Sequence, residues 1–338
     1  GADALRLTLM TGNAPGNDMR FYWERVESSR NFANKVWNAS RFILMNLDAA
    51  EVPEQIEESA LTLEDRWMLH KVNVLASEVT ENMEKFELGI AVQKVYDFIW
   101  EEFCDWYIEM VKPRLYSETE AAKASALWTL KTVLTNALKM LHPFMPFITE
   151  EIFCTLNPEE ESIMISSWPE YRGDWEYAQA AEEVELMKEA VRGIRNVRTQ
   201  LNVPPSKKAS VYVVSENADI RRTFEDGKVF FATLAKASEV FIQENREGIG
   251  EDAVSAMVPG ANIYIPFAEL VDIDKELERL EKEKERLTKE IARSNGMLKN
   301  ERFVSKAPAD KVQAERDKLT KYTQMMEQVE TRLAQLKK

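Results

Sequence analysis

The chain has 338 residues, which is enough for two or three domains of ordinary size. Hydrophobic residues make up 45% of the chain and aromatic residues 9%, so the sequence can bury a sizeable core and is not of the disordered class. The net charge of −14 argues against a simple nucleic-acid binder, and no apolar run reaches the roughly 18 residues that a membrane helix needs.

The residues that catalysis usually requires are scarce in this sequence. It has two histidines and two cysteines, and it contains neither a G-x-G-x-x-G fingerprint nor a phosphate loop with G-K-[ST]. We expect Cys104 and Cys154 to be buried free thiols, and His70 and His142 to be structural. The sequence therefore predicts no catalytic residue, no metal site and no cofactor. It also opens without an initiator methionine or a signal peptide, so we expect a fragment of a longer cytoplasmic protein.

Helical periodicity dominates the first half of the chain. A short helix is predicted from Asp3 to about Met10 and a long one over 21–47, in which the apolar side chains recur at spacings of three and four to form one face. The members of that face are Phe32, Val36, Ala39, Ile43 and Leu47. Further helices are predicted to begin at Thr62, at Leu88 and after Ser117, and a short one covers 148–156. The helix that begins at Leu88 is expected to end at Lys112-Pro113. We expect 1–20 to be a connector and 21–173 an all-helical bundle.

The pattern changes in the next hundred residues. A helix over 174–200 is followed by Pro204-Pro205, and the segments 209–214, 240–242, 253–258 and 261–265 have the composition of β-strands. A further helical segment is expected over 228–236, and Pro259-Gly260 is expected to form a hairpin turn between the last two strands. Residues 174–269 are therefore predicted to form a small α/β module.

Heptads mark the last segment, 270–338. Leucine, isoleucine and valine recur at alternating spacings of three and four on both sides of a connection that contains Pro308, and Lys284, Ser294 and Glu315 are the off-type residues. This pattern predicts two antiparallel helices that form a coiled-coil hairpin, each about 40 Å long at 1.5 Å per residue. The complete predicted fold is mainly α.

Positive charge gathers in two places although the chain as a whole is acidic. Residues 272–338 contain 17 basic and 14 acidic residues, and the basic ones cluster toward the connection of the hairpin. The stretch 192–208 contains five basic residues and no acid. Local basic faces of this kind can bind phosphates even in an acidic protein.

Several motifs resemble those of valyl-tRNA synthetases. They are Gly1-Ala2-Asp3-Ala4-Leu5-Arg6, Arg30-Asn31-Phe32-Ala33-Asn34-Lys35 with Trp37-Asn38, Glu102-Phe103-Cys104-Asp105-Trp106-Tyr107, the run from Leu141 to Glu151, and Lys306-Ala307-Pro308. The resemblance covers the whole chain in order and is to the C-terminal part of bacterial-type enzymes. It implies an anticodon-binding bundle, a small α/β module and a coiled-coil arm that binds tRNA.

The resemblance also implies what this chain lacks. The HIGH and KMSKS motifs of the family's nucleotide-binding fold do not occur here, nor does the editing domain. ATP and valine would be used by the longer protein and not by these residues. The implied partners are a valine-accepting tRNA and the missing N-terminal domains of the same chain, with no membrane and with the chain as a monomer.

Three groups of residues are candidate tRNA contacts. The first lies on the helix over 21–47, where amides, cations and an aromatic ring could read unpaired bases; its members are Arg25, Asn31, Phe32, Lys35 and Asn38. The second is the basic stretch: Arg192, Arg195, Arg198, Lys207 and Lys208. The third lies around the hairpin connection: Arg293, Lys299, Arg302, Phe303, Lys306, Lys311, Arg316 and Lys318.

Each group has a structural alternative. The polar residues of the long helix can be satisfied inside the bundle with Phe32 as core, the arginines of the stretch can pair with acidic neighbours, and the hairpin charges can be ordinary solvated surface. A function of another class also stays open, in which the hairpin binds protein partners or dimerises and the chain is a helical scaffold. Heptads alone do not separate these two functions.

Overall fold

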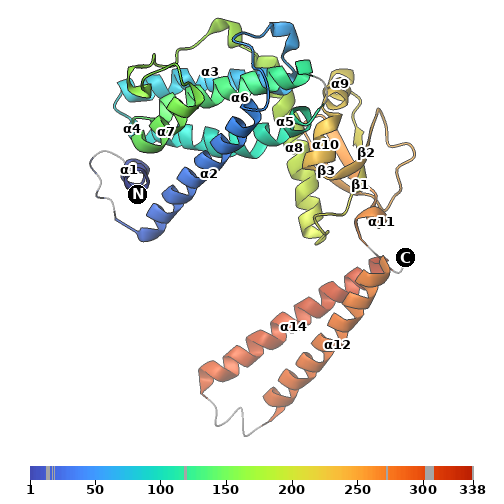
Figure 1. Cartoon of the computed structure of the whole chain (residues 1–338). Helices are drawn as coiled ribbons and strands as arrows, with labels where there is room; N and C mark the ends of the chain where they lie inside the picture. The colour runs from blue at the N-terminus through green and yellow to red at the C-terminus, as the bar shows by residue number, and fades with distance from the viewer. Residues whose placement is uncertain are drawn as a thin grey trace.

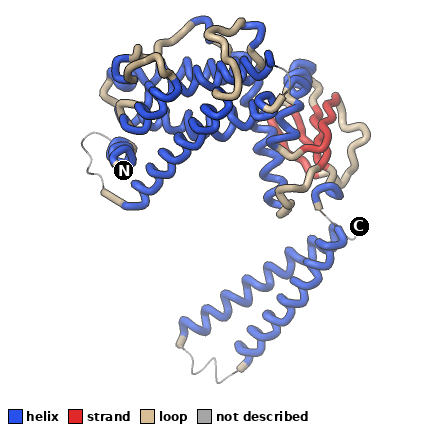
Figure 2. Tube along the Cα trace, in the orientation of Figure 1, coloured by secondary structure: helices blue, strands red, loops and turns tan. Residues whose placement is uncertain are grey.

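The structure is a computed structural model that describes residues 1–12, 16, 18, 20–117, 120–271, 273–300 and 308–336. It is mainly helical, as the sequence predicts, with a bundle, a small sheet flanked by helices, and a long helical hairpin that extends away from the sheet (Figures 1 and 2).

The bundle is built from helices that pack around one apolar core. In chain order they are α1 (Ala2–Met10), α2 (Trp23–Leu47), α3 (Leu63–Glu84), α4 (Leu88–Asp97), η2 (Phe98–Tyr107), α5 (Ile108–Leu115), α6 (Glu120–Leu141) and α7 (Pro146–Leu156). Three members of the predicted apolar face of α2, Phe32, Val36 and Ile43, are fully buried. Short 3₁₀ turns at Glu58–Ala60, Ile163–Ile165 and Gly173–Trp175 lie in the connecting loops.

The predicted helix start at Thr62 is confirmed, and a buried ion cluster holds it in place. The backbone N–H of Thr62 donates to Asp65 Oδ2 at 3.2 Å, which is half of a capping box. Arg114 of α5 then binds both carboxylate oxygens of Asp65, at 2.8 and 2.7 Å, and Glu64 Oε1 at 2.7 Å. The hydroxyl of Tyr107 donates to Asp65 Oδ1 at 2.7 Å. The first turn of α3 is thereby tied to η2 and α5.

The helix that begins at Leu88 differs from its prediction in two ways. We expected it to end at Lys112-Pro113, but α5 continues through Pro113 to Leu115, because Arg114 is held by its ion pairs to α3 and Leu115 is buried. Its middle segment, η2, is π-helical, which periodicity did not predict. The wider turn aligns Phe98, Phe103 and Tyr107 as successive stacked rings inside the bundle.

One long helix, α8 (Ala178–Gln200), packs against both the bundle and the sheet. Its Lys188 is fully buried and binds Glu102 of η2 at 2.5 Å and Glu185 at 2.8 Å. Further along, a Cβ on Gly193 would lie 3.0 Å from the Cβ of Ala256, so the absence of a side chain lets the helix approach the sheet closely. The helix therefore joins the two parts.

The sheet has the strand order β2-β1-β4-β3. The strands are β1 (Ala209–Val214), β2 (Ala237–Gln243), β3 (Val254–Val258) and β4 (Ala261–Ile265); β1 and β2 are parallel, and the other pairs are antiparallel. The β3–β4 hairpin turns at Pro259-Gly260, as predicted, with Gly260 at φ +72°. The predicted helix near 228–236 is α10 (Lys228–Leu234), but α9 (Ala218–Asp226) was missed. Its start is fixed by the Asn217 side chain, which accepts from the backbone of Asp219.

The last segment forms two long helices that lie side by side and run in opposite directions (Figure 1). After the short α11 (Phe267–Leu270), α12 (Ile273–Lys299) is followed by α14 (Ala309–Leu336). Leu280, Leu287, Val312 and Leu333 are buried along the packed faces of the two helices.

The off-type residues of the hairpin pair with partners on the opposite helix. Ser294 Oγ donates to Glu315 Oε1 at 2.7 Å with both residues buried, and Lys284 binds Glu330 at 2.8 Å. Two of the three interruptions, Ser294 and Glu315, thus lie opposite each other, and the Lys284–Glu330 pair fits the same antiparallel register.

Candidate nucleic-acid interface

The outer side of α2 presents a row of exposed polar side chains. Asn31, Asn34, Asn38 and Arg41 are exposed at spacings of three and four, so they follow one side of the helix. Arg25 is exposed near the start of the same helix. Amide and guanidinium groups in such a row are suited to hydrogen bonds with the edges of unpaired bases.

The aromatic ring on this side of α2 is Trp37 and not Phe32. Phe32 has no exposed surface, and its ring stacks on Tyr96 with the centroids 4.3 Å apart. The expectation that a base stacks on Phe32 is therefore not supported, because the ring is part of the core. Trp37 is 46% exposed. The sequence carried a signal for this, because Trp37 falls outside the apolar spacing to which Phe32 belongs.

Lys35 lies between these two sides and already has partners. Its Nζ is 2.6 Å from Asp105 Oδ1 and 3.8 Å from the centre of the Trp100 ring. Trp100 stacks in turn on Tyr96, with 7° between the ring planes. The ammonium group of Lys35 is therefore held in one orientation by the Asp105 carboxylate and the Trp100 ring. It lies at the edge of an aromatic cluster formed by Phe32, Tyr96 and Trp100.

The five members of the basic stretch do not lie together on one face. Arg192 and Arg195 are exposed, and each guanidinium carbon lies 5.3 Å from the centre of the Trp106 ring. Arg198 is buried and donates to the backbone carbonyls of Pro204 and Lys207. Lys208 is exposed and Lys207 is half-buried. Among the described residues none of the five forms an ion pair, although carboxylates act on two of them electrostatically: Asp105 and Glu109 on Arg195, and Glu185 on Arg192.

The charges near the end of the hairpin fall into two kinds. Arg293 pairs with Glu290 at 3.6 Å and Lys318 with Glu315 at 3.5 Å. Lys299, Lys311 and Arg316 have no ion pair within the described part of the chain. The candidates Arg302, Phe303 and Lys306 lie outside the described residues. Nearer the sheet the charges pair along the helix, as Lys282 does with Glu278 at 2.5 Å.

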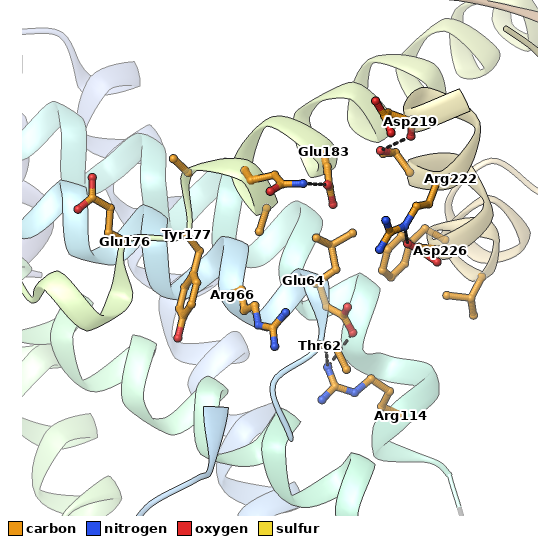
Figure 3. Close-up of a pocket in the computed structure, with 17 residues that line it drawn as sticks. Thr62, Glu64, Arg66, Arg114, Glu176, Tyr177, Glu183, Asp219, Arg222 and Asp226 are labelled. Carbon is orange, nitrogen blue, oxygen red and sulfur yellow. Dashed lines mark hydrogen bonds and ion pairs between the residues drawn. The ribbon is translucent and has the colours of Figure 1, made fainter. Parts of the chain in front are cut away.

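A cavity of about 950 Å³ lies where α3, the start of α8 and the helices α9 and α10 meet (Figure 3). Its polar lining is mostly paired. Arg114 binds Glu64 and Thr62, Gln179 donates to Glu183 at 2.9 Å, and Arg222 is 4.0 Å from Asp226. Burial and the neighbouring Asp65 raise the pKa of Glu64, while Arg114 opposes this. These pairs lie within the bundle, within α8 and within α9, so none of them spans the cavity.

The remaining titratable candidates are two thiols and two histidines, and the Nδ1 of His70 is buried without a hydrogen-bond partner among the described residues. Burial raises the pKa of the Cys104 thiol to about 12, so this buried thiol stays protonated. Cys154 is only half-buried, which corrects our expectation; it lies 3.4 Å from Glu150 Oε1 on one side of α7. His142 Nδ1 is 2.7 Å from the Thr149 hydroxyl. No group of metal-ligating side chains occurs in the described ranges, and none of the helices described is long and apolar enough to cross a membrane.

Two family models match separate segments of this chain. Residues 65–213 match the anticodon-binding domain of tRNA ligases, and residues 272–337 match the valyl-tRNA synthetase tRNA-binding arm. Both matched domains belong to one class of protein, the aminoacyl-tRNA synthetases.

Whole-chain relatives give the particular family. The chain is 51% identical to the valine–tRNA ligase of Clostridium tetani over 337 residues, 44% identical to that of Carboxydothermus hydrogenoformans over 336, and 43% identical to that of Bacillus cereus over 338. It belongs to the valyl-tRNA synthetase family and matches the C-terminal portions of its bacterial members. It spans 38% of the length of these relatives.

One solved structure with a similar fold is a leucyl-tRNA synthetase from Agrobacterium radiobacter K84 in complex with tRNA and LeuAMS. The similarity covers 52% of this chain and 20% of the synthetase chain, at 19% sequence identity and a TM-score of 0.42. That likeness is too low to add to the assignment.

Proposed function

We propose that this chain is the tRNA-holding portion of a valine–tRNA ligase. The bundle takes the anticodon region and the hairpin takes the tRNA body, while domains outside this chain attach valine with ATP. The observation that carries the proposal is the match of two tRNA-binding family models, at residues 65–213 and 272–337, inside a chain 51% identical to a valine–tRNA ligase over its full length. The site of action would be the cytoplasm, and the chain would act as a monomer.

The exposed row on α2 supports a role in reading the anticodon. Asn31, Asn34, Asn38 and Arg41 offer donors and acceptors, and Trp37 offers a ring face beside them. Unpaired bases are recognised by this combination of stacking and hydrogen bonds to their edges. Anticodon bases are unpaired, and for that reason we assign them to this face.

The end of the hairpin supports a second, sequence-independent contact. Lys299, Lys311 and Arg316 keep their charges free of ion pairs with described residues, at the end of an arm about 40 Å long. Lysine and arginine contacts to phosphates position a nucleic acid without reading its sequence. The arm would hold the tRNA body whichever anticodon the tRNA carries.

A tRNA titration at several salt concentrations tests the proposal. The 338-residue chain should bind a valine tRNA with a steep negative salt slope, because phosphate contacts release counterions. A tRNA with an altered anticodon should bind more weakly. Pyrophosphate exchange that depends on valine should stay at background, since the activating domain is not in this chain. Exchange above background, or no affinity for tRNA, contradicts the proposal, and the second result favours a scaffold whose hairpin binds protein.

A further inference from the structure

A groove of about 520 Å³ lies beside the end of α8, where the chain passes from α10 to β2. Arg195, Arg198 and Thr199 of α8 line it, together with Lys236, which immediately precedes β2. Glu109 of α5 is the one carboxylate in the described lining. The groove thus collects three cations, of which Lys236 is 38 residues beyond Arg198 and does not belong to the basic stretch of the sequence.

Arg198 is the unusual member of this groove. It is only 7% exposed, and its Nη2 donates to the carbonyl oxygens of Pro204 at 3.2 Å and Lys207 at 2.5 Å. No described carboxylate forms an ion pair with it, and burial alone lowers its pKa. A buried charge without a counter-ion costs free energy, so an anion that enters the groove would relieve that cost.

Arg195 and Lys236 add charge that water can reach. The Nε of Arg195 donates to the carbonyl of Leu234 at 2.9 Å, and its guanidinium lies over Trp106, so the side chain is oriented before any ligand arrives. Burial lowers the Arg195 pKa, and the carboxylates of Asp105 and Glu109 oppose this without forming an ion pair with it. Lys236 is exposed at φ +57°, in the left-handed region that favours glycine.

We propose that this groove holds a backbone phosphate of the tRNA. The inference rests on the proposed function and adds a third contact region to it, located between the bundle and the hairpin along the molecule (Figure 1). Phosphate oxygens accept paired hydrogen bonds from a guanidinium, and the contact carries no sequence information. Its role would be to fix the tRNA body relative to the anticodon face while the hairpin holds the more distant part.

Arg198 has a structural role that the test must separate from ligand binding, since it fastens the loop over 204–207. The test variant is therefore R195Q/K236Q, which leaves Arg198 in place. The matched control is R222Q/K228Q. It removes one arginine and one lysine charge from positions outside the groove, where they pair with Asp226 and Glu225.

The experiment measures tRNA affinity of the full chain against salt concentration. Each phosphate contact that is lost should flatten the slope of log affinity against log salt by about 0.7–0.9. We expect R195Q/K236Q to lose one or two such contacts. R222Q/K228Q should keep the slope of the parent. Ethylation of individual tRNA phosphates should identify one or two positions that weaken binding to the parent but not to R195Q/K236Q.

Each other result has a definite meaning. If R195Q/K236Q and the parent share one slope and one ethylation pattern while both bind tRNA, the groove holds no phosphate, and the proposed function still stands. If the control flattens the slope equally, the effect is general electrostatics and the groove is not a site. If the parent does not bind tRNA at all, the proposed function fails, and this inference fails with it.

Discussion

Individual side chains of α2 have opposite roles although they are neighbours in sequence. Phe32 fills the core and Trp37 faces outward, because a helix of 3.6 residues per turn places residues five apart on nearly opposite sides. Asn31 and Lys35 flank the buried ring and differ again, since Asn31 is exposed and Lys35 is held by Asp105. A single helix thus supplies packing on one side and polar groups on the other.

This separation predicts different outcomes for two aromatic substitutions. Phe32→Ala should lower the free energy of unfolding by about 3–5 kcal/mol, as the removal of a buried aromatic ring does. Trp37→Ala should leave stability nearly unchanged but weaken tRNA binding by about 1–3 kcal/mol, the value of one base stacked on an aromatic ring. Urea denaturation and tRNA titration of both variants would check this. Unchanged affinity in Trp37→Ala would mean that no base stacks on this ring.

The ion cluster at the start of α3 leads to a second prediction. Arg114→Met leaves Glu64 and Asp65 buried without their cation, which should cost about 3–5 kcal/mol. Burial already raises the pKa of Glu64 above its ordinary 4.5, and loss of Arg114 should raise it further. When the pKa of Glu64 is higher in the folded state than in the unfolded chain, the folded state binds the proton more tightly. The free energy of unfolding should therefore fall as the pH rises through the folded-state pKa. The loss of stability in Arg114→Met relative to the parent should therefore be smaller near pH 4 than near pH 8, as measured by thermal melts.

Arg172→Met is the control for this pH dependence. Its partner Asp174 is exposed, with Nη2 and Oδ2 2.6 Å apart, and Arg172 lowers the pKa of that carboxyl. An exposed pair contributes about 0–1 kcal/mol, and a lowered pKa gives a contribution that is lost as pH falls. A deficit that shrinks at high pH in Arg114→Met would contradict our account of the cluster.

Polar pairs connect neighbouring helices at places where apolar packing alone would allow more than one register. In the hairpin, Ser294 and Glu315 meet between the two helices, and Lys284 meets Glu330 at the edge. Between α8 and the bundle, the buried Lys188 binds Glu102 and lies 5.0 Å from the centre of the Trp67 ring. Polar pairs of this kind select one register of two helices, usually at some cost in stability.

Two variants of the hairpin test this explanation. Ser294→Ala leaves the Glu315 carboxylate buried without its hydroxyl donor and should cost about 1–3 kcal/mol. The double variant S294L/E315L should be as stable as the parent or more stable, because an apolar pair replaces a buried polar one. Amide hydrogen exchange of α12 and α14 gives both values. A double variant less stable than Ser294→Ala would show that the pair stabilises the hairpin and does not only set its register.

The whole molecule places its proposed tRNA contacts on three separate parts, which lie on α2, at the end of α8 and at the end of the hairpin (Figure 1). The hairpin buries its apolar side chains largely against itself, as Leu280, Leu287, Val312 and Leu333 show. Its contribution to tRNA binding should therefore be separable from the stability of the rest.

Truncation after Val271 tests this separation. The chain of residues 1–271 should unfold cooperatively at a temperature close to that of the parent bundle, and its tRNA affinity should drop for all tRNAs alike. Preference for the cognate anticodon should persist, because the face of α2 is intact. Lys299→Ala and Lys311→Ala together, in the full chain, should flatten the salt slope by about 1.4–1.8. A truncated chain without anticodon preference would place the reading of the anticodon elsewhere.

Elements whose signal is local could be predicted from the order of residues alone. Hydrophobic spacing predicted α2 and the two hairpin helices, Thr62 predicted the start of α3, and Pro259-Gly260 predicted the strand turn, because each depends on a few consecutive residues. The family motifs, quoted residue by residue, predicted the assignment that the comparisons confirm. The π-helical turn in η2 and the helix α9 were missed, because long-range packing decides the first and polar composition hides the second.

Which candidate side chains are accessible depends on the tertiary structure. It buried Phe32 against Tyr96 and exposed Trp37, it paired Lys35 with Asp105 across 70 residues, and it brought Lys236 beside Arg198. It also paired Ser294 with Glu315, which heptad spacing marks only as two exceptions. Exposure and pairing depend on what lies opposite a residue in space, and periodicity within one helix carries no information about the neighbouring element.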